Sequence, residues 1–220
     1  NIDGSAVFQI IDSETTYSYD TTTSGQLGKL TGVSNSIAGQ TRSVDVFGNS
    51  TQTMTTTAYD TSDTGLLKTK GIVRAQTVST KIIEVGYYSN PSGINIDSPA
   101  TGYTSGSLLD GSTVEQTVAQ VASYTYDTQG KLLTASDTQA GVTKTQDAFG
   151  NWTKVRTTNT YNSALLAKGI TKVDKSTTRI IDSYNIDGSA VFQIVDSEAA
   201  YSYDTTTSGQ LGKLTGVSNS

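Results

Sequence analysis

Apolar and polar residues alternate along much of this chain, which is the pattern of strands with one buried face. The clearest runs are AVFQIID at 6–12 and NWTKVRTTNTY at 151–161. Short Gly-containing steps such as Gly48-Asn49, Thr64-Gly65 and Gly150-Asn151 separate the runs, and Gly and Asn tolerate the positive φ of hairpin turns. No convincing amphipathic helix is present. The pattern therefore predicts an all-β fold of repeated β-hairpins.

The same 36 residues occur twice in the chain, 184 positions apart. Residues 1–36 and 185–220 differ at only three positions, where Val195, Ala199 and Ala200 replace Ile11, Thr15 and Thr16. A long fixed period is typical of tandem-repeat proteins, in which each unit contacts its neighbours. We expect residues 1–184 to form one repeat period and residues 185–220 to begin the next.

A second, more diverged duplication lies inside this period. Residues 109–127 align without gaps with residues 186–204, and residues 39–60 align with residues 141–162. The period is therefore divided into two halves, about 1–107 and 108–184. Because of this alignment, the run VEQTVAQVA is predicted to be strand although its residues also favour a helix.

An extra segment near 86–107 lengthens the first half. It contains both prolines of the chain and three tyrosines. We expect this segment to form a surface loop, because such a composition is typical of turns and irregular structure.

The composition limits the size of the core. Thr supplies 38 residues and Ser 27. Hydrophobic residues make up only 34% of the chain, below the range of about 45–50% that is usual for globular domains. Thr and Tyr favour strands, and the net charge of −5 is small for a disordered chain of this length. We expect a thinly cored β-sheet protein with much solvated sheet surface.

The residue types also limit the chemistry. The chain has no Cys and no His, which removes disulfides, thiolate metal sites and the commonest general base. Carboxylate pairs are the remaining candidate catalytic groups, and the aspartates lie in turn motifs. We therefore expect no enzyme activity, no metal site and no cofactor. The acidic balance argues against a nucleic-acid partner, and no apolar run is long enough to span a membrane.

The stretch YTYDTQGKLLTASDTQAGVTKTQDAFGNWTKV at 124–155 has a more specific pattern. It resembles the YD repeat of Rhs proteins and teneurins, whose pattern is close to YDxxGxLxxxxDxxGxxTxxxYDxxGN. In such a unit the Tyr packs on a sheet face, the Asp accepts backbone N–H groups in the turn, and the Gly takes positive φ. The residues of this pattern, counted over its degenerate copies, are Tyr19, Asp20, Gly25, Asp45, Gly48, Asn49, Tyr59, Asp60, Tyr126, Asp127, Gly130, Asp147, Gly150, Asn151, Tyr203 and Asp204.

The resemblance implies a specific architecture. In this family, YD hairpins build one long sheet that spirals into a hollow shell, which in the Rhs toxins encloses a cargo. The self-cleaving DPxGL-like segment and the toxin region of the family have no match in this sequence. The resemblance therefore implies a continuous spiralling sheet, as a β-solenoid or the wall of a hollow tube, without the toxin function.

Two functions follow as hypotheses. Near-identical units that make the same contact with each neighbour extend without closing, which predicts a structural unit of an extracellular β-rich filament or tube whose partner is itself. The alternative is a stalk or adhesin at the cell surface, which binds carbohydrate or another surface through Tyr87, Tyr88, Tyr103 and Trp152. A passive loop, for the tyrosines, and a packed sheet position, for Trp152, are the competing interpretations.

Overall fold

The computed structural model describes residues 6–91, 94, 100–191 and 193–219, and within them the regular secondary structure consists of strands apart from two short helical segments. The chain begins with β1 (Ala6–Ile11), β2 (Glu14–Tyr19), β3 (Leu30–Ile37), β4 (Gly39–Val44), β5 (Asn49–Tyr59), α1 (Leu66–Lys70), β6 (Ala75–Tyr88) and β7 (Tyr103–Ser105). It continues with β8 (Thr113–Val118), β9 (Gln120–Tyr126), β10 (Leu132–Gln139), β11 (Gly141–Gln146), β12 (Trp152–Tyr161), α2 (Ser163–Leu166), β13 (Val173–Tyr184), β14 (Ser197–Tyr203) and β15 (Leu214–Asn219). The prediction of an all-β fold is confirmed. The run VEQTVAQVA at 114–122 belongs to two strands, since β8 ends at Val118 and β9 begins at Gln120.

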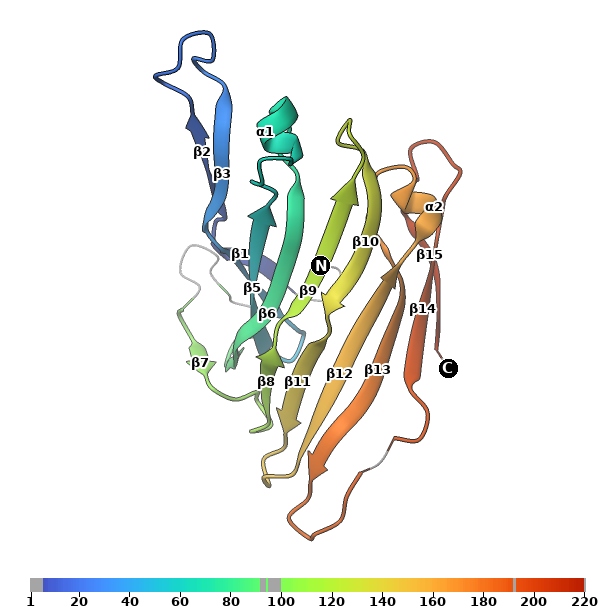
Figure 1. Cartoon of the computed structure of the whole chain (residues 1–220). Helices are drawn as coiled ribbons and strands as arrows, with labels where there is room; N and C mark the ends of the chain where they lie inside the picture. Colours follow the sequence, from blue (N-terminus) through green and yellow to red (C-terminus); the bar gives the residue numbers. More distant parts are fainter. Residues whose placement is uncertain (1–5, 92–93, 95–99, 192, 220) are drawn as a thin grey trace.

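The strands form antiparallel sheets that lie side by side. One sheet has the order β1-β4-β5-β6-β9-β10, with β7 also paired to β6, and another has the order β15-β14-β13-β12-β11-β8. β2 and β3 form a separate hairpin. Contacts of β6 with β8 and of β10 with β12 join the two large sheets, so that the strands follow one another from β2 and β3 at one side to β14 and β15 at the other (Figure 1). The described residues form no closed barrel or solenoid.

The two short helices differ from the expectation of hairpins throughout. The turn predicted at Thr64-Gly65 is present, since the Gly65 amide donates to Ser62 O at 3.0 Å. It is not a positive-φ hairpin turn, because Gly65 has a φ of −70° and directly precedes α1. A glycine is needed there for space, since a Cβ would lie 2.6 Å from the carboxylate of Asp60. The helical turns bury Leu67 in α1 and Leu165 in α2, and this burial of apolar side chains explains why the connections fold inward instead of forming tight turns.

The apolar core is thin, as the composition predicted. Phe8, Val44 and Tyr88 form one buried cluster, around which Ala6, Ile10, Ile94 and Tyr103 pack. Large apolar side chains also remain at the surface, among them Phe47 and Phe149, which are 70% and 79% exposed at the tips of equivalent turns. The sheets are therefore held together mainly by strand pairing and by side-chain contacts between neighbouring strands.

The extra segment near 86–107 is only partly a loop. It begins within β6 and returns as β7, which pairs with β6 through Gly86↔Ser105 and Tyr88↔Tyr103. The prolines and tyrosines were expected to mark irregular structure, and residues 92–93 and 95–99 of this segment lie outside the described residues.

Candidate functional site

The aspartates of the YD motifs hold the turns between strands. In the turn between β9 and β10, Asp127 Oδ1 accepts hydrogen bonds from Gln129 N and Lys131 N, both at 2.8 Å. In the turn between β11 and β12, Asp147 Oδ1 accepts from two amides at 2.9 Å each. Backbone amides in the corresponding turns also donate to Asp20, Asp45, Asp60 and Asp204.

These hydrogen bonds favour the ionised form of the carboxylates. The Lys131 amide is the main cause of the lowered pKa of Asp127, and the Asn151 side chain is the main cause for Asp147. The Thr207 amide lowers the pKa of Asp204 in the same way. A carboxylate that is held ionised by its own turn suits a structural role better than proton transfer, which works best with a pKa near the working pH.

The motif glycines lie where the turns need positive φ. Gly130 and Gly150 have φ values of 81° and 94°, and Gly25 and Gly48 have 79° and 92°. The sequence analysis missed Gly28, which has a φ of 81° and donates from its amide to Asp20 O at 2.8 Å. The sequence contains a pattern that identifies this glycine, because the tripeptide GKL recurs at 28–30, 130–132 and 212–214. Gly28, and not Gly25, is therefore the counterpart of Gly130.

Two motif tyrosines tie their hairpins to the neighbouring long strands, β6 and β13. Tyr126 Oη donates to Ala75 O at 2.9 Å, and Tyr203 Oη donates to Val173 O at 2.7 Å. Burial is the main cause of the raised pKa of both phenols. Tyr19 holds the same motif position but is 55% exposed. Tyr59 makes a different contact, 3.2 Å from its hydroxyl to Thr15 Oγ1.

The same strand junction is formed twice in the structure. At the first junction β6 pairs with β9, from Thr77↔Ser123 to Thr80↔Gln120. At the second junction β13 pairs with β14, from Lys175↔Ala200 to Thr178↔Ser197. In the alignment of the chain with itself, Thr80 corresponds to Thr178 and Gln120 to Ser197. The two junctions therefore have an identical register.

A glutamine side chain continues each junction beyond the end of its backbone ladder. At the first junction Gln116 Oε1 accepts from Ile82 N at 2.7 Å, and Gln116 Nε2 donates to Thr80 O at 3.4 Å. At the second junction Gln193 Oε1 accepts from Ile180 N at 2.6 Å, and its Nε2 donates to Thr178 O at 3.2 Å. A primary amide supplies both a donor and an acceptor and so replaces one residue of a ladder.

An asparagine links each FGN turn to a later Asp-Gly turn. Asn49 Oδ1 accepts from Leu109 N, and Asn151 Oδ1 accepts from Ile186 N, both at 2.9 Å. The amide nitrogen of Asn151 also donates to Asp147 Oδ2 at 2.7 Å. The Gly-Asn step of the motif therefore serves a contact between strands as well as its own turn.

The tyrosines proposed for surface contact have different surroundings. The prediction that Tyr88 contacts an outside surface is wrong, because it is only 2% exposed. Its ring centroid lies 5.1 Å from that of Tyr103, and Arg42 lies 3.8 Å from the Tyr103 centroid and donates to Tyr88 Oη at 3.1 Å. Arg42 also pairs with Glu84 at 3.2 Å. The extra segment folds back because a buried guanidinium needs such partners. Tyr87 and Tyr103 are half-buried.

Trp152 is a half-buried residue at the first position of β12. Its ring stacks on Tyr184 of β13 at a centroid distance of 6.2 Å. The ammonium groups of Lys144 and Lys154 each lie 5.1 Å from the ring centroid. Trp152 and Tyr184 are also paired across the two strands, which makes the aromatic pair part of the sheet surface.

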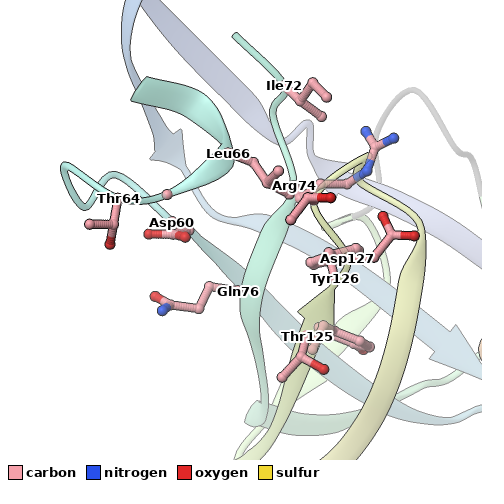
Figure 2. Close-up of a pocket in the computed structure, with 12 residues that line it drawn as sticks. Asp60, Thr64, Leu66, Ile72, Arg74, Gln76, Thr125, Tyr126 and Asp127 are labelled. Atoms are coloured by element: carbon pink, nitrogen blue, oxygen red, sulfur yellow. The ribbon is translucent and has the colours of Figure 1, made fainter. Parts of the chain in front are cut away.

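An open cleft of about 340 Å³ lies at the first junction, between the connection that contains α1 and the hairpin of β9 and β10. Figure 2 shows that Asp60, Arg74, Tyr126 and Asp127 face this space from both sides. Their polar atoms are used within the fold: both carboxylates accept hydrogen bonds in their turns, Tyr126 bonds to Ala75, and Arg74 Nε donates to Gly130 O at 2.8 Å. The residues that line the cleft are therefore part of the junction. The hydrogen bonds of Tyr126 and Arg74 hold the hairpin of β9 and β10 against β6 and the residue before it.

Across the described residues, no group of three or more Asp or Glu lies together as metal ligands. No described helix has the length and apolar character needed to cross a bilayer. The side chains that the structure brings together are those of the repeated junctions. No family model, no curated protein and no solved structure matches this chain.

Proposed function

We propose that this chain is a structural segment of an extracellular β-rich filament or tube, built from a long tandem-repeat protein with a period of 184 residues. The observation that supports this function best is the identical register of the two junctions, β6 with β9 and β13 with β14. The same glutamine and the same tyrosine contact occur at both. A contact that is repeated between successive units with one geometry adds units along one direction.

The thin wall also fits this function. A repeat protein is stabilised by contacts between nearest neighbours and does not need one large core. In this wall, the hairpins of β9 with β10 and of β14 with β15 pair with part of the edges of β6 and β13, which removes unpaired backbone groups there. The YD-repeat resemblance supports a wall that curves. The near-identical copy at 185–220 supports a wall that continues through further periods.

Electron cryomicroscopy of filaments made by a protein with several 184-residue periods tests the proposal. We expect unbroken density from one period into the next, an axial repeat set by a whole number of periods, and the β13–β14 register at each period boundary. Separate β-domains joined by flexible linkers would contradict the filament.

A second candidate function is a stalk or adhesin that binds carbohydrate, and the stacked pair of Trp152 and Tyr184 favours it. Tyr184 is 50% exposed, and accessible aromatic rings with a polar edge are suited to binding surfaces. Because Trp152 is the single tryptophan of the chain, its fluorescence reports directly on this place. Oligosaccharides that bind here should shift the emission, and Tyr184→Ala should remove the response while Tyr87→Ala keeps it. An emission unchanged across a panel of oligosaccharides would contradict this function.

A further inference from the structure

We propose that the turns at one end of the strands, the lower rim, dock on the connections at the other end, the upper rim, of a second copy of this chain. Copies then stack along the direction of their strands. This inference goes beyond the proposed filament, whose contact runs across the strands from one period to the next. It adds a second direction of assembly and identifies the partner as a second copy of this chain.

The lower rim consists of the turns at 45–49, 108–112, 147–151 and 185–189. The asparagine side chains described above join these turns in pairs. A Cβ at Gly111 would lie 3.2 Å from Ala148, so the two pairs also lie against each other. The lower rim is therefore one continuous row of turns.

A large apolar side chain is exposed at each turn of the lower rim. These side chains are Phe47, Leu109, Phe149 and Ile186. The turns follow or connect strands that are already paired within the sheets, so this exposure does not come from an open strand edge. A row of exposed apolar side chains among polar residues is typical of a surface that contacts another protein.

The turns themselves do not need an aromatic ring. Asp127 on the upper rim and Asp147 on the lower rim each accept hydrogen bonds from the amides two and four residues later. The residue two positions after the aspartate is Gln129 in the upper turn and Phe149 in the lower turn. Two turns with the same hydrogen bonds therefore present a polar side chain on one rim and an aromatic side chain on the other.

The upper rim includes α1, α2 and the tip of the β9–β10 hairpin (Figure 1). Its residues are 20–29, 60–74, 127–131, 162–172 and 204–213. Arg74 Nε donates to Gly130 O at 2.8 Å, which joins the first helical connection to the hairpin. Lys168 Nζ donates to Thr205 O, which joins the second helical connection to the last hairpin. The upper rim therefore also forms a row along the sheets.

Two open clefts, of about 340 Å³ and about 590 Å³, lie between the connections of the upper rim. Leu66 and Ile72 line the first cleft, Leu132 lines the second, and Tyr126 lines both. Arg74 also lines both clefts and faces the first one in Figure 2. An aromatic ring that enters such a cleft contacts apolar side chains and lies beside a cation, which is favourable. The clefts therefore suit the exposed phenylalanines of the lower rim.

The two rims carry opposite charge. The upper rim has eight Lys or Arg against five Asp, whereas the lower rim has four Asp and no Lys or Arg. In the part of the chain that the structure describes, none of these charged side chains forms an ion pair. A lower rim on an upper rim brings opposite charges together, whereas two like rims repel each other. Charge therefore selects a second copy in the head-to-tail orientation.

The spacing of the features along the two rims is also compatible. The half of the period at 108–184 places a DGS turn and an FGN turn on the lower rim, and a YD hairpin and a helical connection on the upper rim. Because both rims belong to the same strands, a contact made by one half recurs at the next half. The contact joins two different surfaces, so it leads to open stacks and not to closed dimers.

Disulfide trapping between two full chains tests the docking, because the natural sequence has no Cys and gives no background. Ala148→Cys puts a thiol on the lower rim, and Thr128→Cys puts one at the same position of the upper turn; both residues are exposed. The two variants carry tags of different mass, are mixed and oxidised, and are compared with each variant alone on non-reducing gels. Pairing of strand edges cannot give the mixed bridge, since the ten residues of β12 keep the two rims roughly 30 Å apart.

The mixed bridge should exceed the bridge of either variant alone by at least about tenfold, because like rims repel. Phe47→Gln with Phe149→Gln in the lower-rim chain should reduce the mixed bridge at least about tenfold, since aromatic anchors supply most of the binding energy of an interface. Glutamine is the residue of the equivalent upper turn. Lys131→Glu with Lys172→Glu in the upper-rim chain should reduce the bridge several-fold.

The matched control is Ile83→Gln with Ile181→Gln in the lower-rim chain. It also removes two exposed apolar side chains, but they lie within β6 and β13 and not on a rim. The control should leave the mixed bridge unchanged. A control that reduces the bridge as much as the two phenylalanine replacements do would overturn the role of the lower rim.

Other results also decide against the inference. Equal yields of mixed and single-variant bridges overturn the docking, and so does a mixed bridge that survives the phenylalanine replacements. Retention on immobilised alginate that depends on Lys131 and Lys172, without a mixed bridge, would assign the upper rim to an acidic polysaccharide instead. The filament is judged separately: continuous density across periods without the mixed bridge keeps the filament and removes the stacking, whereas the mixed bridge between discrete domains does the reverse.

Discussion

Replacing Gln116 with alanine tests whether the glutamine contact stabilises the junction. Gln116 is only 8% exposed, and its carbonyl accepts from Ile82 N at 2.7 Å. A hydrogen bond contributes about 0.5–1.5 kcal/mol net, and a buried amide left without a partner costs about 1–3 kcal/mol. The bond to Thr80 O is long, at 3.4 Å, and adds little. We expect Gln116→Ala to lower the free energy of unfolding by about 2–3 kcal/mol.

The chain supplies matched controls at the two equivalent positions. Gln193 makes both hydrogen bonds but is more exposed than Gln116, so Gln193→Ala should cost about 1 kcal/mol. Gln9 is exposed, and its side-chain amide donates to the nearby Ile11 O, so Gln9→Ala should cost less than about 0.5 kcal/mol, as is usual at the surface. Gln116→Glu keeps an acceptor for Ile82 N but brings an unpaired carboxylate into a buried site beside Thr80 O, so its cost should be at least that of Gln116→Ala.

Urea unfolding followed by circular dichroism gives the free energies, and hydrogen exchange gives the local effect. A loss of about 2–3 kcal/mol corresponds to a midpoint shift of about 1 M for a slope near the upper end of the usual range. The amide of Ile82 should lose protection in Gln116→Ala and keep it in Gln9→Ala. A cost for Gln116→Ala no greater than that for Gln9→Ala, with Ile82 still protected, would refute the reasoning.

Three further predictions follow from the turns and the buried arginine. Gly48 and Gly150 have φ values of 92° and 94°, so alanine at Gly150 should cost about 1–2 kcal/mol; alanine at Gly48 should cost clearly more by urea unfolding, because its Cβ would lie 2.5 Å from Tyr88 O. Arg42→Ala should cost about 3 kcal/mol by leaving buried partners unpaired, whereas Lys144→Ala at the corresponding position should cost less than about 1 kcal/mol. Asp20, Asp127, Asp147 and Asp204 have a folded pKa below the ordinary value of 3.8, mainly because of hydrogen bonds within their turns. The stability that they give is therefore present above that value and is lost as the pH falls through the lower folded values. The melting temperature should fall between about pH 5 and pH 2, and asparagine at these positions should flatten that slope.

The sequence by itself determined the local structure of this protein. Alternation predicted the strands, and the spacing of Asp and Gly predicted turns such as that of Asp127 and Gly130, because the contacts involved span only a few residues. The copy at 185–220 and the weaker internal repeat could also be recognised from the sequence alone. The two helical turns were missed, since their sequences lack an amphipathic period and fold inward only to bury Leu67 and Leu165.

Only the tertiary structure decided which strands pair and which side chains are buried. The residues of AVFQI form β1 at 6–10 because β4 lies beside them, whereas 190–191 and 193–194 of the copy are not strand. A strand needs a neighbour for its backbone groups, and the copy at 185–220 does not include the residues that correspond to β4. In the same way Tyr19 is exposed while the identical Tyr203 bonds to Val173 O on β13. Burial and pairing depend on residues far away in the chain, and a local pattern carries no information about them.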